Sequence, residues 1–256
     1  MQPTDFQELT CKQCINAADL DFDFTMAFQP ILDLQKQNVF AYEALVRGLN
    51  GESAGEILGK VNDSNRYRFD QCCRVKAVNL ASDLEMEARL SINFLPNAIY
   101  KPESCIRTTI AACKTYNFAV ENIIFEVTEV ERIDDKAHLQ NIFEYYHKRG
   151  LMTAIDDFGS GYAGLSLLTD FLPDLIKLDM ELIRDIDKKP AKQAIVNGVR
   201  NTCESMHIDI IAEGVETEAE LDYLYGIGIR KFQGYLFARP EVAALPSVTI
   251  PVFEQA

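Results

Sequence analysis

The chain has 256 residues, 48% of them hydrophobic, and a formal net charge of −14 at pH 7. This length suits one large domain or two ordinary ones, and the apolar fraction is enough for a sizeable core. Because the chain is acidic and has no basic tract, it lacks the clustered positive charge with which proteins bind DNA or RNA, and an anionic ligand would need cations between itself and the protein.

The first 22 residues are mixed and polar, and we expect them to form an arm or short helix ahead of a folded domain at residues 23–256. They lack the basic start and apolar stretch of a signal peptide, and no apolar run in the chain approaches the roughly 20 residues of a membrane span. The seven cysteines, Cys11 and Cys14 among them, are odd in number and scattered, which is typical of reduced thiols. These features predict a soluble cytoplasmic protein.

From Phe24 onward, short β-rich runs alternate with stretches of helical periodicity. The predicted strands are 25–34, 39–47, 90–95, 123–128, 151–158, 175–179, 209–215 and 231–237. Several of these runs are almost continuously apolar, as strands buried on both faces are. The predicted helices are 66–85, 104–116, 137–148, 191–205 and 218–225.

The order of these elements indicates the fold class. Only Gln35–Asn38 separates the first two strands, so they could form an antiparallel hairpin. After them, strands and helices alternate, which predicts an eight-stranded α/β barrel with an unusual start. A doubly wound sheet is the main alternative.

Polar side chains recur where the predicted strands end, which is where α/β barrels gather their catalytic groups. They are Glu43 and Arg47 on the second strand, Asn93 on the third, Glu126 and Glu129 on the fourth, Asp156 and Asp157 on the fifth, Lys177 and Asp179 on the sixth, Glu213 and Glu216 on the seventh, and Gln233 on the eighth. One such residue usually means only contact with solvent. Seven consecutive strands with the same feature indicate a functional site.

Four of these carboxylates interrupt otherwise apolar runs: Glu43, Glu126, Asp156 and Asp157. Buried carboxylates without partners are costly, and crowded ones repel each other and hold protons unless a cation joins them. With the Asn93 amide they offer only oxygen ligands, and none of the three histidines falls at a strand end. Such a set favours Mg²⁺, Mn²⁺ or Ca²⁺ over zinc, and the adjacent aspartates could bridge two ions.

Lys177 is the one cation among these interior strand-end residues. It could form a structural salt bridge with Asp179 or with a neighbouring carboxylate. Alternatively, it could hold or deprotonate an attacking water, or offset negative charge in a transition state. The Gly159-Ser160-Gly161 segment predicts a loop over the site, although it lacks the pattern of a dinucleotide or P-loop motif.

The segment Tyr42–Arg47 resembles the signature of the EAL-domain family, the cyclic di-GMP phosphodiesterases. Further matching motifs follow in order: Ile92–Pro96, Phe125–Glu129, Asp156–Leu165, Ile176–Asp179, Ala212–Glu216 and Gln233–Gly234. The resemblance covers roughly residues 24–245. It implies a TIM-like (β/α)8 barrel with an antiparallel first strand, and hydrolysis of cyclic di-GMP to linear pGpG at a two-metal site with Mg²⁺ or Mn²⁺, Ca²⁺ being expected to inhibit.

The resemblance also implies roles for individual residues. The implied metal ligands are Glu43, Asn93, Glu126, Asp156, Asp157 and Glu213, the last directly or through water. The implied ligand contacts are Gln29, Arg47, Asp70, Glu216 and Gln233, with Arg47 binding phosphate and Gln233 near the metals as well. Lys177 would be the general base or the water-orienting group, and Glu129 would brace the loop that begins at Asp157. For Asp70 a plain surface position on its helix is the alternative.

Two features of the segment after Asp157 bear on regulation. Many relatives have Ser or Thr where this chain has Ala163, and the missing hydroxyl would otherwise help Glu129 hold the loop. Relatives often dimerise through this loop and the helix after it. Here the apolar residues are Leu165, Leu167, Leu168, Phe171 and Leu172, which form either a homodimer interface or ordinary barrel core.

Two other functions remain open on the same barrel. One is a catalytically weak receptor that binds cyclic di-GMP, and the other is a protein-interaction regulator that needs neither metal nor nucleotide. Degenerate receptors usually lose metal ligands, whereas this chain keeps every expected one, so the enzyme is the favoured hypothesis. The expected partners are cyclic di-GMP and a second copy of the chain, with no DNA, RNA or membrane.

Overall fold

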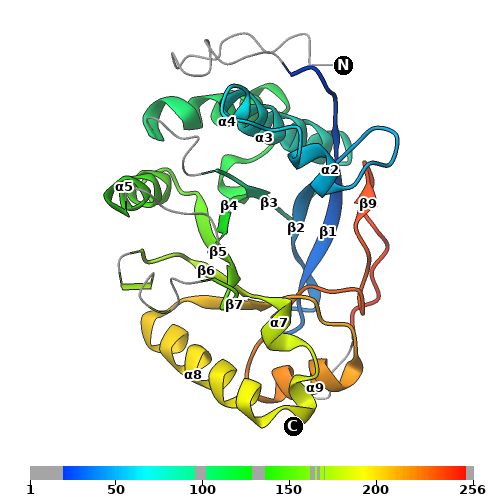
Figure 1. Cartoon of the computed structure of the whole chain (residues 1–256), viewed down its shortest axis with the longest axis vertical. Coiled ribbons are helices and arrows are strands. Elements are labelled where there is room, and N and C mark those ends of the chain that lie inside the picture. The colour runs from blue at the N-terminus through cyan, green and yellow to red at the C-terminus, as the bar shows by residue number, and fades with distance from the viewer. Residues whose placement is uncertain are drawn as a thin grey trace.

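The computed structural model describes residues 20–95, 102–128, 136–161, 165, 168–169 and 171–251. Within them, nine strands form one sheet in the order β2-β3-β4-β5-β6-β7-β8-β1-β9, and β2 also pairs with β1, so that β1 to β8 close into a barrel (Figure 1). The strands are β1 (Thr25–Asp33), β2 (Asn38–Arg47), β3 (Arg89–Asn93), β4 (Ile123–Thr128), β5 (Met152–Phe158), β6 (Leu175–Leu178), β7 (Asp209–Ala212), β8 (Lys231–Phe232) and β9 (Glu241–Val242).

Strand β1 departs from the parallel pattern of the others. It runs antiparallel to β2 on one side and to β8 on the other, whereas each neighbouring pair from β2 to β8 is parallel. The Asp33 carboxylate holds the turn after β1 by accepting hydrogen bonds from the backbone N–H groups of Gln35 (3.1 Å) and Lys36 (3.0 Å). The predicted TIM-like barrel with an antiparallel first strand is confirmed. The doubly wound alternative is wrong, because its sheet stays open.

The helices pack around the outside of the barrel (Figure 1). They are α2 (Ala54–Leu58), α3 (Arg66–Asp83), α4 (Pro102–Thr115), α5 (Lys136–His147), α7 (Met180–Ile183), α8 (Pro190–Met206) and α9 (Glu218–Gly226), with 3-10 turns η2 (Val120–Asn122) and η3 (Ile186–Lys188). The five longest match the predicted ranges to within two residues at each end. Helices α2 and α7 were not predicted, because four or five residues carry no readable helical period. None of the helices in the described ranges is long and apolar enough to cross a membrane.

The last three barrel strands end earlier than predicted, at Leu178, Ala212 and Phe232. The chain beyond them still makes backbone contacts with the barrel. The N–H group of Glu213 donates to the carbonyl of Leu178 (3.2 Å), and that of Gln233 donates to the carbonyl of Ala212 (2.9 Å). Backbone hydrogen bonds therefore hold Glu213 and Gln233 at the barrel mouth, although both lie beyond the ends of their strands.

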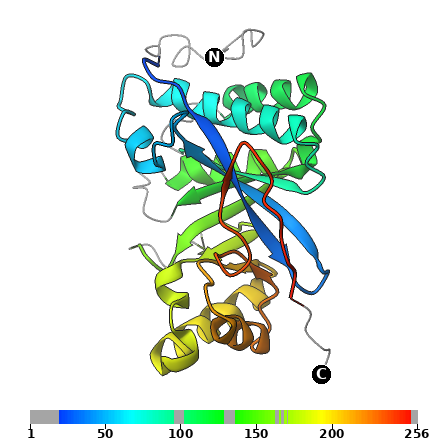
Figure 2. The same ribbon diagram turned by 90° about the vertical axis from the view of Figure 1, so that its right-hand side faces the viewer.

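The chain after β8 returns along β1. The short strand β9 pairs antiparallel with β1, with Ala27 opposite Val242, and Figures 1 and 2 show this segment beside β1. The Ala243 N–H group donates to the Met26 carbonyl at 2.9 Å. A two-residue strand has no alternation to detect, which is why β9 was not predicted.

An apolar layer fills the barrel interior beneath the polar strand ends. We call this layer the floor: Ala41, Ile124, Ala154, Leu175 and Ile211, all buried in one cluster. Strand side chains alternate between faces, so residues two positions apart point to the same side. The residues two positions after the floor are, in the same order, Glu43, Glu126, Asp156, Lys177 and Glu213. Because side chains alternate along each strand, a charged layer lies directly above the apolar floor in the barrel interior.

Candidate active site

The charged layer consists of carboxylates gathered around one ammonium group. We call the carboxylates the ring: Glu43, Glu126, Asp156, Asp157 and Glu213. The Nζ atom of Lys177 lies 3.2 Å from Glu43 Oε2, 3.0 Å from Glu126 Oε2, 3.0 Å from Asp156 Oδ1 and 2.8 Å from Glu213 Oε1. The lysine side chain is only 1% exposed. One ammonium thus links the ends of four strands.

The sequence predicted that Lys177 could form a salt bridge either with Asp179 or with a neighbouring carboxylate, and the structure distinguishes these two partners. Its ion pairs are with the ring, the neighbouring carboxylates, and not with Asp179. The carboxylate of Asp179 instead accepts a hydrogen bond from the Glu181 N–H group at 2.8 Å and caps the start of α7.

Other hydrogen bonds fix the orientation of the ring. The hydroxyl of Ser91 donates to Glu126 Oε1, so both oxygens of that buried carboxylate are engaged. The Asn93 amide donates to Glu43 Oε1 at 3.0 Å. The carboxylate of Asp156 accepts from the backbone N–H group of Asp157 at 3.0 Å. These contacts hold the ring oxygens in place, which limits how far the carboxylates can move apart.

The ring holds more negative charge than Lys177 can neutralise. Burial, followed by the charges of its ring neighbours, raises the pKa of Glu126 to about 8 and that of Glu213 well above its ordinary value. Burial and the charge of Asp156 raise the pKa of Asp157 to about 6. Burial disfavours the charged form of Lys177, yet the surrounding carboxylates raise its pKa well above the ordinary value. This imbalance is the electrostatic condition that an added cation would relieve.

The ring divides into two groups that could each hold a metal ion. The inner triplet is Glu43, Glu126 and Asp156, all buried, and the outer triplet is Asp156, Asp157 and Glu213, of which two are half-buried. In each triplet one carboxylate oxygen per residue lies within 4.8 Å of the others. An all-oxygen set suits Mg²⁺, Mn²⁺ or Ca²⁺. The residues present therefore fit divalent cations.

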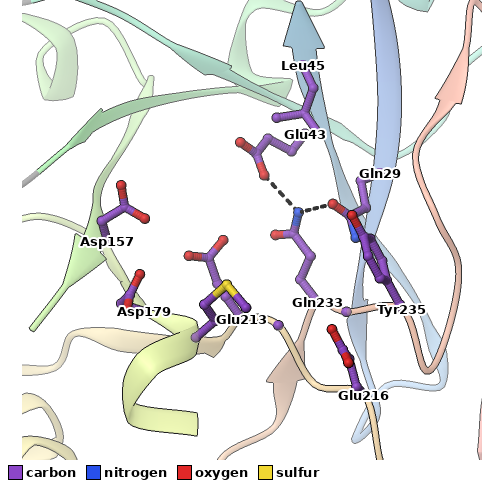
Figure 3. A pocket seen from close by; sticks show the side chains of 12 residues that line it. Gln29, Glu43, Leu45, Asp157, Asp179, Glu213, Glu216, Gln233 and Tyr235 are labelled. Atoms are coloured by element: carbon purple, nitrogen blue, oxygen red, sulfur yellow. Dashed lines mark hydrogen bonds between the residues drawn. The ribbon is translucent and has the colours of Figure 1, made fainter. Parts of the chain in front are cut away.

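A cavity of about 230 Å³ opens above the ring (Figure 3). Its lining is Gln29, Glu43, Leu45, Asp157, Asp179, Met180, Glu213, Gly214, Glu216, Gln233, Gly234 and Tyr235. The carboxylates of Asp157 and Glu213 lie on one side of it, and the amides of Gln29 and Gln233 on the other (Figure 3). A ligand in this cavity would touch the ring and both amides.

The two glutamines form a hydrogen-bonded chain. The Nε2 group of Gln233 donates to Glu43 Oε2 (2.7 Å) and to Gln29 Oε1 (3.2 Å), as the dashed lines of Figure 3 mark. The Nε2 group of Gln29 donates to the Ala238 carbonyl at 3.4 Å. The Oε1 atom of Gln233 is buried and accepts no hydrogen bond from the described residues. It is a fixed acceptor at the wall of the cavity.

Three of the residues expected to contact the ligand, Glu216, Arg47 and Asp70, differ in their position relative to this cavity. Glu216 lines the cavity and is held by Arg184, whose Nη2 atom lies 2.8 Å from Glu216 Oε1. Arg47 is half-buried at the end of β2, where its guanidinium donates to its neighbour's carbonyl, and it does not line this cavity. Asp70 is buried and pairs with Arg74 at 2.8 Å, so its alternative as a surface residue is wrong.

Asp70 faces a second cavity, of about 350 Å³, beside the first. Its walls are mainly apolar, and Asn93 and Thr128 also line it. The Asp70 carboxylate accepts a hydrogen bond from the Leu95 N–H group at 3.1 Å. The two vicinal cysteines of α3 lie close by: Cys73 lines this second cavity, and Cys72 and Cys73 pack against the core.

Several expectations fall outside the described residues: those for Glu129, Ala163, Leu167, Cys11 and Cys14. The rest of the expected dimer surface is divided. Leu168 and Phe171 are buried in the core, whereas Leu165 is 49% and Leu172 is 61% exposed. Half of that set is therefore barrel core, and dimerisation through the exposed pair stays a prediction.

Sequence reasoning missed Tyr235 and Met180, which both line the first cavity. Tyr235 is 48% exposed at the rim, and the guanidinium of Arg239 lies 4.2 Å from its ring centroid. The available signal was position, because Tyr235 directly follows the Gln233-Gly234 pair at the end of β8. Met180 begins α7, which was too short to be predicted.

Comparison with solved structures places this geometry among known proteins. A standalone versatile EAL protein from Vibrio cholerae O395, solved in its c-di-GMP bound form, is 54% identical; the match covers 90% of this chain and 98% of that one, with a TM-score of 0.88. BlrP1 from Klebsiella pneumoniae, solved with cy-diGMP and calcium, is 38% identical over 88% of this chain and 57% of that one, with a TM-score of 0.83. Its complex with manganese and cy-diGMP gives a TM-score of 0.81, covering 89% and 58% of the two chains.

Among curated proteins, the blue light- and temperature-regulated antirepressor BluF of Escherichia coli K12 is 33% identical over 88% of this chain and 56% of its own length. The probable cyclic di-GMP phosphodiesterase PdeG of the same organism is 34% identical over 63% of this chain and 32% of its own length. The chain thus spans about a third of the length of PdeG and just over half of the length of BluF. The model of the EAL domain matches residues 16–240, and the chain therefore belongs to the EAL-domain family.

Proposed function

We propose that this chain hydrolyses one phosphodiester bond of cyclic di-GMP, giving linear pGpG, in a reaction that depends on Mg²⁺ or Mn²⁺. The observation that carries this proposal is the ring: two overlapping carboxylate triplets, rigidly held, that open into a ligand-sized cavity. The proposed metal ligands are the ring residues together with Asn93, which already contacts Glu43.

The charge of the substrate explains why the ring needs metal ions. Cyclic di-GMP is a dianion, and a cavity lined by Asp157, Glu213 and Glu216 would repel it. Divalent cations held in the ring would reverse that repulsion, lower the pKa of an attacking water and stabilise the leaving oxygen. The protein supplies the fixed oxygens, and the apolar floor keeps water away from them on the inner side.

The other site residues would position the reacting groups. The surrounding carboxylates raise the pKa of Lys177 well above its ordinary value, which favours the water-orienting role over that of a general base. The Oε1 atom of Gln233 would accept a hydrogen bond from a water or hydroxyl in the cavity, and Gln29 holds Gln233 in that orientation. Arg47, at the end of β2 and outside the cavity lining, would reach phosphate only by leaving the Val46 carbonyl, 2.7 Å from its Nη1 atom.

A second candidate function is regulation without hydrolysis, either as a receptor for cyclic di-GMP or as a protein-interaction regulator. The likeness to BluF, which is named as an antirepressor and not as a hydrolase, favours it. The intact ring distinguishes the two candidates, because a receptor has no use for two overlapping triplets of costly buried carboxylates.

One assay tests both candidates. Purified protein is incubated with cyclic di-GMP and Mg²⁺, Mn²⁺, Ca²⁺ or EDTA, and pGpG is followed by chromatography. We expect pGpG with Mg²⁺ or Mn²⁺ and none with Ca²⁺ or EDTA. Binding of cyclic di-GMP without product under any metal would overturn the enzyme and support the receptor, and absence of both would leave the protein-interaction regulator.

A further inference from the structure

Lys177 has more partners than it has donors. An ammonium group carries three N–H donors, and Lys177 faces four carboxylates at 2.8 to 3.2 Å. The Nζ group donates hydrogen bonds to Glu43 and Glu126, and it forms ion pairs with Asp156 and Glu213. In this arrangement the ring surrounds the ammonium group, and a water or a substrate oxygen would have to compete with the carboxylates for its donors.

The contacts of Lys177 fall unequally on the two triplets. It pairs with all three members of the inner triplet, and each of those residues is buried. Of the outer triplet it pairs with Asp156 and Glu213 but has no ion pair with Asp157, which lines the open cavity. The inner triplet already has its cation, whereas the outer triplet keeps one unpaired and accessible carboxylate.

We infer that Lys177 is the built-in competitor for the inner metal position, so that the two metal ions bind in order: the outer one first, and the inner one only when Lys177 gives up Glu43 and Glu126. The inference rests on the metal-binding role proposed for the ring. Displacement of Lys177 by the inner metal ion would also serve catalysis, because loss of the contacts with Glu43 and Glu126 frees N–H donors of Lys177 to orient the attacking water. The lysine is held out of its catalytic role until the inner position is filled.

The test is equilibrium binding of Mn²⁺ to the full chain without nucleotide, by calorimetry and by electron paramagnetic resonance of free Mn²⁺. We expect two binding events in the native protein, the first at least tenfold tighter than the second. In Lys177→Met, which keeps the unbranched side chain up to the ε position and removes the charged nitrogen, the second event should tighten at least tenfold. In Lys177→Arg, which keeps the charge, it should stay weak. Asp157→Asn should weaken the first event.

Thermal melting with and without Mn²⁺ separates this effect from misfolding. Lys177→Met should melt lower than the native protein without Mn²⁺ and should gain more in melting temperature on adding it. Two equal events in the native protein, which need no variant, would overturn the inference, as would an unchanged or weaker second event in Lys177→Met. Absence of any Mn²⁺ binding would instead contradict the metal role in the proposed function.

Discussion

Replacing Glu126 by Gln should remove activity while leaving the fold almost as stable as before. In its ionised form, Glu126 is attracted to Lys177 Nζ at 3.0 Å by about 5.5 kcal/mol at an effective dielectric constant of about 20. The same form is repelled by Glu43 and Asp156, whose oxygens lie within 4.8 Å, by about 3.5 kcal/mol or more for each. These opposing contributions nearly cancel, and because the pKa of Glu126 is raised to about 8, its carboxyl group is largely protonated at neutral pH and the amide removes little charge. Lys177 keeps its other three carboxylate partners.

Two measurements check this expectation. The free energy of unfolding in urea, with EDTA present, should differ from the native value by no more than about 2 kcal/mol, less than the cost of about 3–5 kcal/mol of breaking an ordinary buried ion pair. Hydrolysis with Mn²⁺ should fall at least about 100-fold, the scale on which even supporting residues of metal sites act. The matched control is Asp33→Asn, the same chemical change at a buried carboxylate at the end of β1, which should leave activity unchanged.

Either of two results would refute this reasoning. A loss of stability above about 3 kcal/mol would mean that the ring is a structural ion-pair network in which Glu126 is indispensable. Retained activity would mean that Glu126 is not a metal ligand, and the inner triplet would then have no catalytic role.

Three further predictions concern other parts of the molecule. Tyr235→Ala should raise the KM for cyclic di-GMP about fivefold or more by removing a stacking face at the cavity rim, while Tyr235→Phe should not; equal KM values would refute stacking. His147 and Asp174 pair at 2.9 Å, which raises the pKa of the histidine and contributes to lowering that of the aspartate. The pair stabilises the fold at pH values above the depressed pKa of Asp174, and this stabilisation is lost as the pH rises through the raised pKa of His147. The melting temperatures of the native protein and of His147→Gln should therefore differ more at pH 5.5 than at pH 8.5. Leu172→Glu should convert a dimer to a monomer in light scattering, and an unchanged mass would exclude this surface.

The regular parts of the fold were predictable because they carry a period. Helix α8 and strand β4 lie within two residues of their predicted bounds, since α8 repeats apolar residues at helical spacing and β4 is an apolar run interrupted by Glu126. The contacts of Lys177 were only partly predictable, because they depend on how four strands meet in space. The short helix α7 had no signal of its own, and it brings Met180 into the cavity and turns Asp179 away from Lys177.

The position of the ring follows from the same alternation that makes the strands recognisable. Each floor residue lies two positions before a ring residue or Lys177, so the apolar layer that closes the barrel also fixes the height of the charged layer above it. The apolar floor lies beneath the carboxylates, and Ser91 donates to Glu126 and fixes one of its oxygens. They cannot spread, because Asn93 and Gln233 hold Glu43 from two sides. The geometry of the barrel thus brings the carboxylates of the ring close together. Their mutual repulsion must be offset by positive charge, which either Lys177 or divalent metal ions can supply.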